Sequence, residues 1–368
     1  MPRRLSYQDM QDLITGAIVL GCGGGGDPAM AQAMVDEVFS NGKEFSLLDP
    51  KELRAEDWVC ILGHVGGGVD PHEREMVKDL PRIWPHPILI AEEELAKYLQ
   101  VEFRAYLPSE IGAGNTVTPL YVAALRGKSV IDGDAAGGRA KPELIISTTH
   151  LLGIPVPPIA LANYYGDSLI VKNSSSDDRV EKICRYLSRV SGGRVAAARC
   201  PSQGKQILPA IYPYSISLAI QAGKTIREEK ERAVETLTKV LKGSKRFAGQ
   251  VESFSREERD GFMWGEILFK GSGEFSGERF KIWYKNENLV AWKNNQLDIT
   301  CPDAIIILDA RTGNGLYNWG DHFFPGREVA VLGIPAAPIW NCAQGWETFG
   351  PSHFGFDFSP KQIQADDH

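Results

Sequence analysis

The chain has 368 residues, of which 43% are hydrophobic and 24% are charged, and its formal net charge is −7. This length favours two domains, and the acidic balance without a long basic run argues against nucleic acid or an anionic membrane as the main partner. The six scattered cysteines form no C-x-x-C pair. With no apolar signal core and no membrane-length apolar run, we expect a reduced, cytoplasmic protein.

Strand-like and helix-like segments alternate through the first half of the chain. We predict strands at residues 17–20, 44–48, 58–62, 87–90 and 129–131, and helices at residues 28–40, 116–125 and 142–152. Asp27 and Pro28 suit the N-cap and the first position of the first of these helices. The alternation predicts an α/β domain over residues 1–165, with a mostly parallel sheet and helices on both faces.

The second domain, residues 166–368, has a different pattern. A helix is expected at residues 228–242, and short alternating runs follow at residues 265–270, 279–285, 288–293, 304–308 and 328–332. Turn residues separate these runs. The spacing predicts a β-rich, barrel-like antiparallel structure from about residue 249 to residue 340.

A glycine-rich turn follows the first expected strand. Residues 21–26 match G-x-G-x-x-G, and Asp49 ends the next strand in the place of a ribose-binding acid. Glycines allow close backbone approach, and the following helix N-terminus favours an anion such as phosphate, a carboxylate or a developing oxyanion. A tight turn without a ligand is the alternative interpretation.

Two further loops follow expected strands or precede an expected helix. His64 lies within a glycine cluster at residues 63–68, where it could act in acid–base chemistry, bind a ligand or simply pack. Glu110 lies just before Gly112, Gly114 and Asn115. Burial would raise the pKa of Glu110 and suit it to proton transfer, while Asn115 either caps the helix or contacts a ligand.

A fourth loop carries Asp132, Asp134, Arg139 and Glu143 among small residues. The two aspartates could hold a divalent cation together with His64. Arg139 could bind a carboxylate or phosphate in bidentate fashion, or form a structural ion pair with Glu143 or Asp134.

These loops, taken in order, resemble the S-methyl-thiohydantoin desulfurase-like family. The motifs are residues 20–28, 110–115 and 132–143, and residues 304–340, 350–351 and 354–355 resemble the second domain of that family. The resemblance covers nearly the whole chain. It implies an α/β N-terminal domain, a β-rich C-terminal domain and a reaction that replaces a sulfur substituent on a hydantoin-like ring by oxygen.

That reaction suggests roles for the loop residues. Glu110 is the first choice for the base that activates water, with Asp132 or Asp134 second and His64 as a further catalytic candidate. Helix N-termini after the glycine loops could stabilise negative charge. The expected substrate-binding residues are Gly23, Gly24, Gly25, Gly26, Asn115, Arg139 and Glu143.

A metal held by Asp132, Asp134 and His64 is the alternative means of activating water, and no nucleotide is favoured as a cofactor. The expected partner is a small cyclic substrate, with homo-oligomers or association with hydantoinase-like proteins left open. Two other functions remain under consideration. One is a nicotinamide- or flavin-dependent oxidoreductase, and the other is a non-enzymatic small-molecule-binding subunit.

Overall fold

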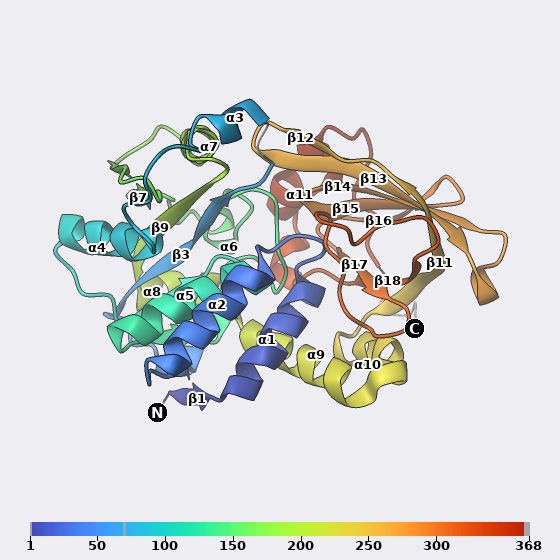
Figure 1. The fold of residues 1–368 in the computed structure, drawn as a ribbon, viewed down its shortest axis with the longest axis horizontal. Coiled ribbons are helices and arrows are strands. Elements are labelled where there is room, and N and C mark those ends of the chain that lie inside the picture. The colour runs from blue at the N-terminus through green and yellow to red at the C-terminus, as the bar shows by residue number, and fades with distance from the viewer. Residues whose placement is uncertain (1, 69–70, 364–368) are drawn as a thin grey trace.

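The computed structural model describes residues 2–68 and 71–363, and two β-sheets organise them (Figure 1). The first sheet has eight strands in the order β1-β2-β5-β4-β3-β9-β7-β8. The bounds of these strands are β1 (Arg3–Leu5), β2 (Phe45–Leu48), β3 (Trp58–Gly66), β4 (Ala105–Pro108), β5 (Ser129–Ile131), β7 (Ile159–Ala162), β8 (Ser168–Val171) and β9 (Arg194–Gln203).

This sheet is mixed rather than mostly parallel. Parallel pairing joins only the run β2-β5-β4-β3, and the outer strands β1, β9, β7 and β8 are added antiparallel. The β7–β8 pair is a hairpin, because the Asn163 side chain accepts hydrogen bonds from the backbone N–H groups of Tyr165 and Asp167 and closes the turn. A tight turn of this kind returns the chain antiparallel, whereas a parallel pair needs a long crossover.

Both faces of the first sheet are buried at its central strand β3. In β3, Cys60 and Leu62 belong to one hydrophobic cluster, whereas Val59 and Ile61 belong to another on the opposite face. This alternation follows from the two-residue period of a strand. The first cluster also takes apolar residues from the helices α1 (Tyr7–Leu20), α2 (Pro28–Ser40), α4 (Pro87–Leu99), α5 (Ala113–Arg126), α9 (Ser215–Glu229) and α10 (Ala233–Val240).

The remaining helical segments are short, except for α7 (Asp177–Val190). They are α3 (Pro71–Glu75), α6 (Thr148–Leu151), α8 (Gly204–Ile207) and α11 (Ala343–Phe349). A two-stranded pair, β6 (Gly133–Asp134) and β10 (Tyr212–Pro213), lies beside α9. Within the described residues, no helix has the length and apolar character needed to cross a membrane.

The second sheet is antiparallel throughout and curls as a half-barrel (Figure 1). Its strands run in the order β16-β15-β14-β13-β11-β18-β17, and β12 pairs with β13 outside this path. The bounds are β11 (Ser244–Phe254), β12 (Glu257–Arg259), β13 (Phe262–Gly271), β14 (Arg279–Lys285), β15 (Glu287–Lys293), β16 (Gln296–Thr300), β17 (Ala304–Asp309) and β18 (Glu328–Ile334). The prediction of a β-rich antiparallel tail is therefore confirmed.

Some of the elements predicted from the sequence are wrong. Residues 17–20 are the last turn of α1 and residues 87–90 are the first turn of α4, not strands. Short apolar runs do not distinguish a buried strand from a buried helix. The start of α1 lies further upstream, where Ser6 and Asp9 form a reciprocal capping box.

Two predicted helices are also shorter than expected. Of residues 142–152, only Thr148–Leu151 are helical. The segment 228–242 is divided between the end of α9, a 3₁₀ turn at Lys230–Arg232 and α10. The chain turns at Lys230, whose φ of +50° interrupts the helix.

Candidate active-site cavity

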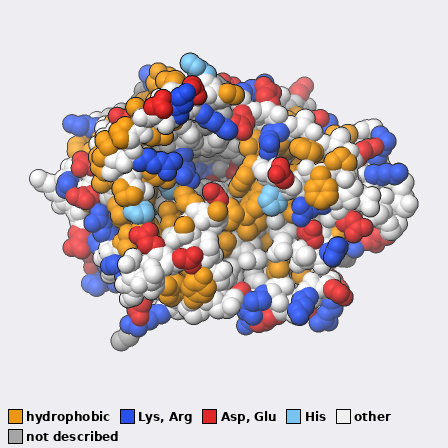
Figure 2. Space-filling model, in the orientation of Figure 1, with side chains coloured by type: hydrophobic (Ala, Val, Ile, Leu, Met, Phe, Trp, Pro, Cys, Tyr) orange, Lys and Arg blue, Asp and Glu red, His pale blue; other side chains and the backbone are white. Residues whose placement is uncertain are grey.

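A cavity of about 480 Å³ opens between the first sheet and the half-barrel. Its walls come from β3 and β9, from the loops around Gly24 and Glu110, and from the start of β15. Figure 2 shows the opening as a hollow on this face, with basic side chains along its rim. The volume lies within the usual range for small-molecule sites.

The glycine loop, residues 21–26, follows a helix rather than a strand. It connects α1 to α2, and Asp27 caps α2 by accepting a hydrogen bond from the backbone N–H of Ala29. The dinucleotide motif requires a strand before its glycines, so this loop lacks the required context. Asp49 accepts from the N–H of Lys51 and from the Tyr214 hydroxyl, and it is not among the residues that line the cavity.

The loop glycines allow close packing against two other segments of the chain. A Cβ atom on Gly24 would lie 1.7 Å from Glu287 Oε1, and one on Gly25 would lie 2.5 Å from the Cα atom of Gly112. The carbonyl of Gly25 also accepts hydrogen bonds from the N–H groups of Gly114 and Asn115. The N–H groups of Gly114 and Asn115 at the start of α5, and that of Ala29 at the start of α2, therefore already have partners in the protein.

Substitution of Gly25 by alanine should destabilise the fold by at least ~3 kcal/mol, since the new Cβ meets backbone atoms and the residue has a φ of +88°. The matched control is Gly42→Ala, where φ is +64° but no atom lies within 4 Å of the added Cβ. That variant should lose only ~1–2 kcal/mol from the left-handed backbone. Chemical denaturation measures both, and equal losses would contradict the packing role of Gly25.

Glu110 lies in the cavity wall, between β4 and α5, and only 4% of its surface is exposed. Its carboxylate accepts from Asn115 Nδ2 at 2.5 Å and from the backbone N–H of Lys141 at 3.3 Å. Burial raises the pKa of Glu110, although Lys141, Asn115 and Arg199 act in the opposite direction. Asn115 therefore does not cap α5, whose N-cap is Gly112, and its side chain instead donates a hydrogen bond to Glu110.

Glu287 is a second buried carboxylate in the same wall, supplied by the first residue of β15. It is 3% exposed, and its Oε2 atom has no hydrogen-bond partner among the described residues. Burial, reinforced by the nearby charge of Glu110, raises the pKa of Glu287 to about 8. The sequence analysis missed this residue because it lies in what reads as a simple turn between two strands.

His64 lines the cavity from β3. Burial and the neighbouring Arg194 lower the pKa of His64 to about 3, so its imidazole is neutral at physiological pH. Its Nδ1 atom lies 3.5 Å from the Thr118 hydroxyl. A neutral histidine can accept or donate a hydrogen bond here, but it carries no positive charge.

Cationic groups contribute the opposite charge to the cavity. Lys141 lies in the wall, where burial and the charge of Arg199 lower its pKa to about 8. Arg199 is 3% exposed and donates to Cys200 Sγ, while Arg194 donates to the Tyr164 hydroxyl. The cavity therefore combines the buried carboxyl groups of Glu110 and Glu287 with several cations, an arrangement typical of sites that transfer protons.

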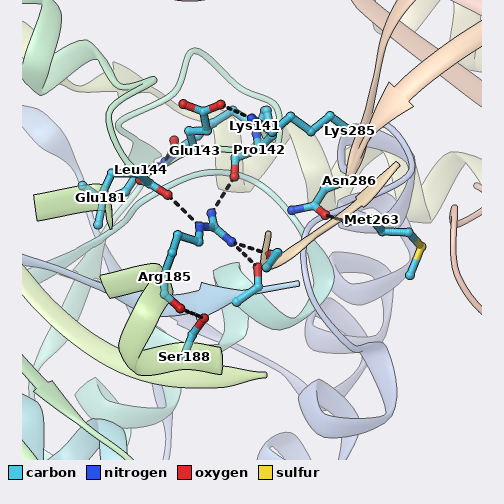
Figure 3. Close-up of polar contacts among 12 residues, drawn as sticks. Lys141, Pro142, Glu143, Leu144, Glu181, Arg185, Ser188, Met263, Lys285 and Asn286 are labelled. Atoms are coloured by element: carbon cyan, nitrogen blue, oxygen red, sulfur yellow. Dashed lines mark hydrogen bonds and ion pairs between the residues drawn. The ribbon is translucent and has the colours of Figure 1, made fainter. Parts of the chain in front are cut away.

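Glu143 also lines the cavity, but it is bound by side chains of the C-terminal half (Figure 3). It forms an ion pair with Lys285, and its other oxygen lies 3.1 Å from His353 Nε2. Burial would raise the pKa of Glu143, but the hydrogen bonds and charges of His353 and Lys285 lower it to about 2. Glu143 is thus an ionised carboxylate, in contrast to Glu110 and Glu287.

Arg185 holds the cavity wall together from α7 (Figure 3). Its guanidinium donates to Glu181 and to the backbone carbonyls of Gly66, Pro142 and Gly261. These carbonyls belong to three separate segments of the chain. Multiple bonds from one rigid, planar group fix the relative positions of those segments.

Asp132, Asp134 and Arg139 do not line the cavity. Asp132 accepts from the N–H and hydroxyl of Ser217, near the start of α9. Asp134 is buried and accepts from the N–H groups of Ala136 and Gly138, and burial raises its pKa to about 6. Arg139 donates to the carbonyls of Ala140, Asn288, Pro302 and Asp303.

The structure also separates the three proposed metal ligands. His64 faces the cavity, whereas Asp132 and Asp134 bond to backbone and serine groups elsewhere. Within residues 2–68 and 71–363, no group of three or more His, Cys, Asp or Glu side chains is arranged to hold a metal ion. The residues brought together at the cavity are Gly24, Gly25, Gly26, His64, Glu110, Asn115 and Glu143, with Glu287 as an addition.

The protein thus combines a mixed sheet, an antiparallel half-barrel and a cavity lined by two buried carboxyl groups, those of Glu110 and Glu287. Family models for the S-Me-THD-like N-terminal domain and the S-Me-THD-like C-terminal domain match residues 8–173 and 175–363. The chain therefore belongs to the S-methyl-thiohydantoin desulfurase-like family, and the resemblance seen in its loops is confirmed.

Comparison with solved structures supports the same architecture. The X-ray crystal structure of a protein from Chromobacterium violaceum matches with a TM-score of 0.81 and 22% sequence identity, over 98% of this chain and 100% of that one. At this level of identity the likeness shows the fold alone. A comparison with curated proteins finds no match.

Proposed function

We propose that this protein is an enzyme that hydrolytically removes the sulfur substituent of an S-alkylated thiohydantoin-like ring. The observation that carries this proposal is the buried carboxyl group of Glu110 in the wall of a cavity of suitable size, within a desulfurase-like family. In this reaction, water adds to the ring carbon that bears sulfur, and a thiol leaves as the ring carbonyl forms.

Glu110 acts as the base that accepts a proton from the attacking water. Its raised pKa makes it a stronger base than an ordinary glutamate, and Asn115 orients the carboxylate through its side-chain amide. Lys141 lies close enough to interact electrostatically with Glu110, and its charge would stabilise negative charge that develops on the ring during addition.

The purified chain should release methanethiol from an S-methyl-thiohydantoin and form the corresponding hydantoin. A thiol-reactive dye follows the release, and mass spectrometry in ¹⁸O-water follows incorporation of one oxygen atom into the ring. Thiol release without ¹⁸O in the ring carbonyl would contradict direct hydrolysis. An inactive but well-folded chain would favour a non-enzymatic binding subunit.

The oxidoreductase alternative depends on the glycine motif, which here joins two helices. Titration of the protein with NAD, NADP and FAD tests that alternative directly, and we expect no binding in the micromolar range. Micromolar binding of any of the three would restore the oxidoreductase hypothesis.

A further inference from the structure

We infer that Glu287 is a second catalytic residue that acts as a proton donor. Glu287 and Glu110 share one proton, in the sense that one of them is protonated while the other is ionised, and they exchange these two states within each turnover. This inference rests on the proposed hydrolytic reaction. It adds a residue from the half-barrel to a site whose other acid–base group belongs to the N-terminal half of the chain.

The geometry of Glu287 supports this role. The side chain is buried in the cavity lining, and Oε2 lacks a hydrogen-bond partner among the described residues. An unpartnered carboxyl oxygen in a buried position is costly and calls for a ligand or a proton. Gly24 leaves room for the other oxygen, since a Cβ at that position would overlap Oε1.

Electrostatics favours a single proton between the two glutamates. Two buried carboxylates that interact strongly do not both ionise, because like charges in a low-dielectric site repel. The charged groups that act on Glu287 are Glu110, which raises its pKa, and Arg139, Lys141 and Arg185, which lower it. With a resulting pKa of about 8, Glu287 retains its proton at neutral pH.

With Glu110 and Glu287 acting as a pair, every proton transferred in the reaction has a donor and an acceptor. In the first step, Glu110 takes a proton from water as the water oxygen bonds to the ring carbon, and Glu287 gives its proton to the adjacent ring nitrogen as the C=N double bond becomes single. In the second step, the new hydroxyl returns a proton to Glu287 as C=O forms. The C–S bond breaks with its electron pair on sulfur, and Glu110 gives its proton to that sulfur.

The products are a ring carbonyl and a neutral thiol, and each glutamate recovers its starting state. One water molecule is consumed, and no metal, oxidant or further base is required. A single carboxyl group would have to serve both the nitrogen and the water in the same step. The second carboxyl group therefore supplies the proton for the ring nitrogen while Glu110 accepts a proton from water.

Infrared spectroscopy of the substrate-free protein tests the shared proton. The wild type should show the C=O band of a protonated carboxylic acid at pH 7 that disappears as the pH rises through about 8. Glu287→Gln should lack this band. Glu143→Gln is the matched control, because Glu143, in the same cavity wall with a pKa near 2, is already ionised and should not contribute. Absence of the band in the wild type would overturn the inference.

Kinetics tests the proton transfer itself. Glu287→Gln should lower kcat by at least ~100-fold. In a Lys141→Arg background, where the residue at position 141 stays charged and does not titrate near pH 8, the residual kcat/KM of Glu287→Gln should no longer fall near pH 8. Glu287→Asp, which keeps a transferable proton, should recover part of the rate and the alkaline limb. A purely structural role would lower the rate without moving that limb, and such a result would overturn the inference.

Different results would contradict the hydrolytic reaction and the role of Glu287. A wild-type protein that shows the infrared band but releases no thiol from an S-methyl-thiohydantoin contradicts the proposed reaction, while the shared proton stands. A wild-type protein that releases thiol, but whose Glu287→Gln variant keeps full activity and the alkaline limb, contradicts the role of Glu287 and leaves the reaction standing.

Discussion

Glu110→Gln is expected to lower kcat for thiol release from an S-methyl-thiohydantoin by at least ~100-fold, the usual size of a lost general base. Glutamine matches glutamate in shape, so the variant should remain folded, but its amide does not accept a proton from water. Since burial raises the pKa of Glu110 above its usual value of 4.5, the acidic limb of the wild-type pH profile should also lie above pH 4.5. Activity requires the ionised base and should fall below that limb.

Glu102→Gln provides the control for this experiment. Glu102 precedes β4 and its side chain is 88% exposed, so its replacement removes a carboxylate of the same type outside the cavity. Its kcat should remain within about twofold of the wild type. A Glu110→Gln variant with the same thermal stability and the same kcat as Glu102→Gln would eliminate Glu110 as the base.

Arg139→Met is expected to destabilise the protein by roughly 3–5 kcal/mol, the largest stability effect we predict. Arg139 is buried, and its guanidinium donates to the carbonyls of Asn288, Pro302 and Asp303, all in the C-terminal half of the chain. Methionine fills much of the same volume but leaves these carbonyls without their donor. The loss should appear as a lower denaturant midpoint and a reduced Tm.

Arg232→Met is a suitable comparison, because the Arg232 side chain is 76% exposed and its ion pair with Glu229 lies on the surface. Its unfolding midpoint should be almost unchanged. Should Arg139→Met be as stable as Arg232→Met, the three carbonyl contacts of Arg139 with the C-terminal half would not be holding the two halves together.

Local signals in the sequence predicted part of the fold correctly. The helix at residues 28–40 begins at the Asp27 cap, and the alternating runs of the C-terminal half are strands. The apolar run at residues 17–20 was misassigned because the glycines after it resemble a strand end, while its true cap lies at Ser6. Tertiary packing rather than local pattern decides such short runs.

The candidate site was only partly predictable for a related reason. Glu110, His64 and Asn115 are recognisable because they lie beside glycines, and the structure places all three along one cavity. Glu287 and Arg139 depend on contacts between residues far apart in the chain. No local pattern indicates that Glu287 Oε2 is left without a hydrogen-bond partner, or that the partners of Arg139 are backbone carbonyls.

The contact between Gly24 and Glu287 has a consequence for how sequences of this family can vary. Because the carboxyl of Glu287 occupies the space that a side chain at position 24 would need, a larger residue at position 24 requires the side chain at position 287 to shift or to be shorter. A relative with alanine at position 24 should carry a shorter residue, such as aspartate, at position 287. Covariation between positions 24 and 287 in related sequences would show that this one contact couples residues far apart in the chain.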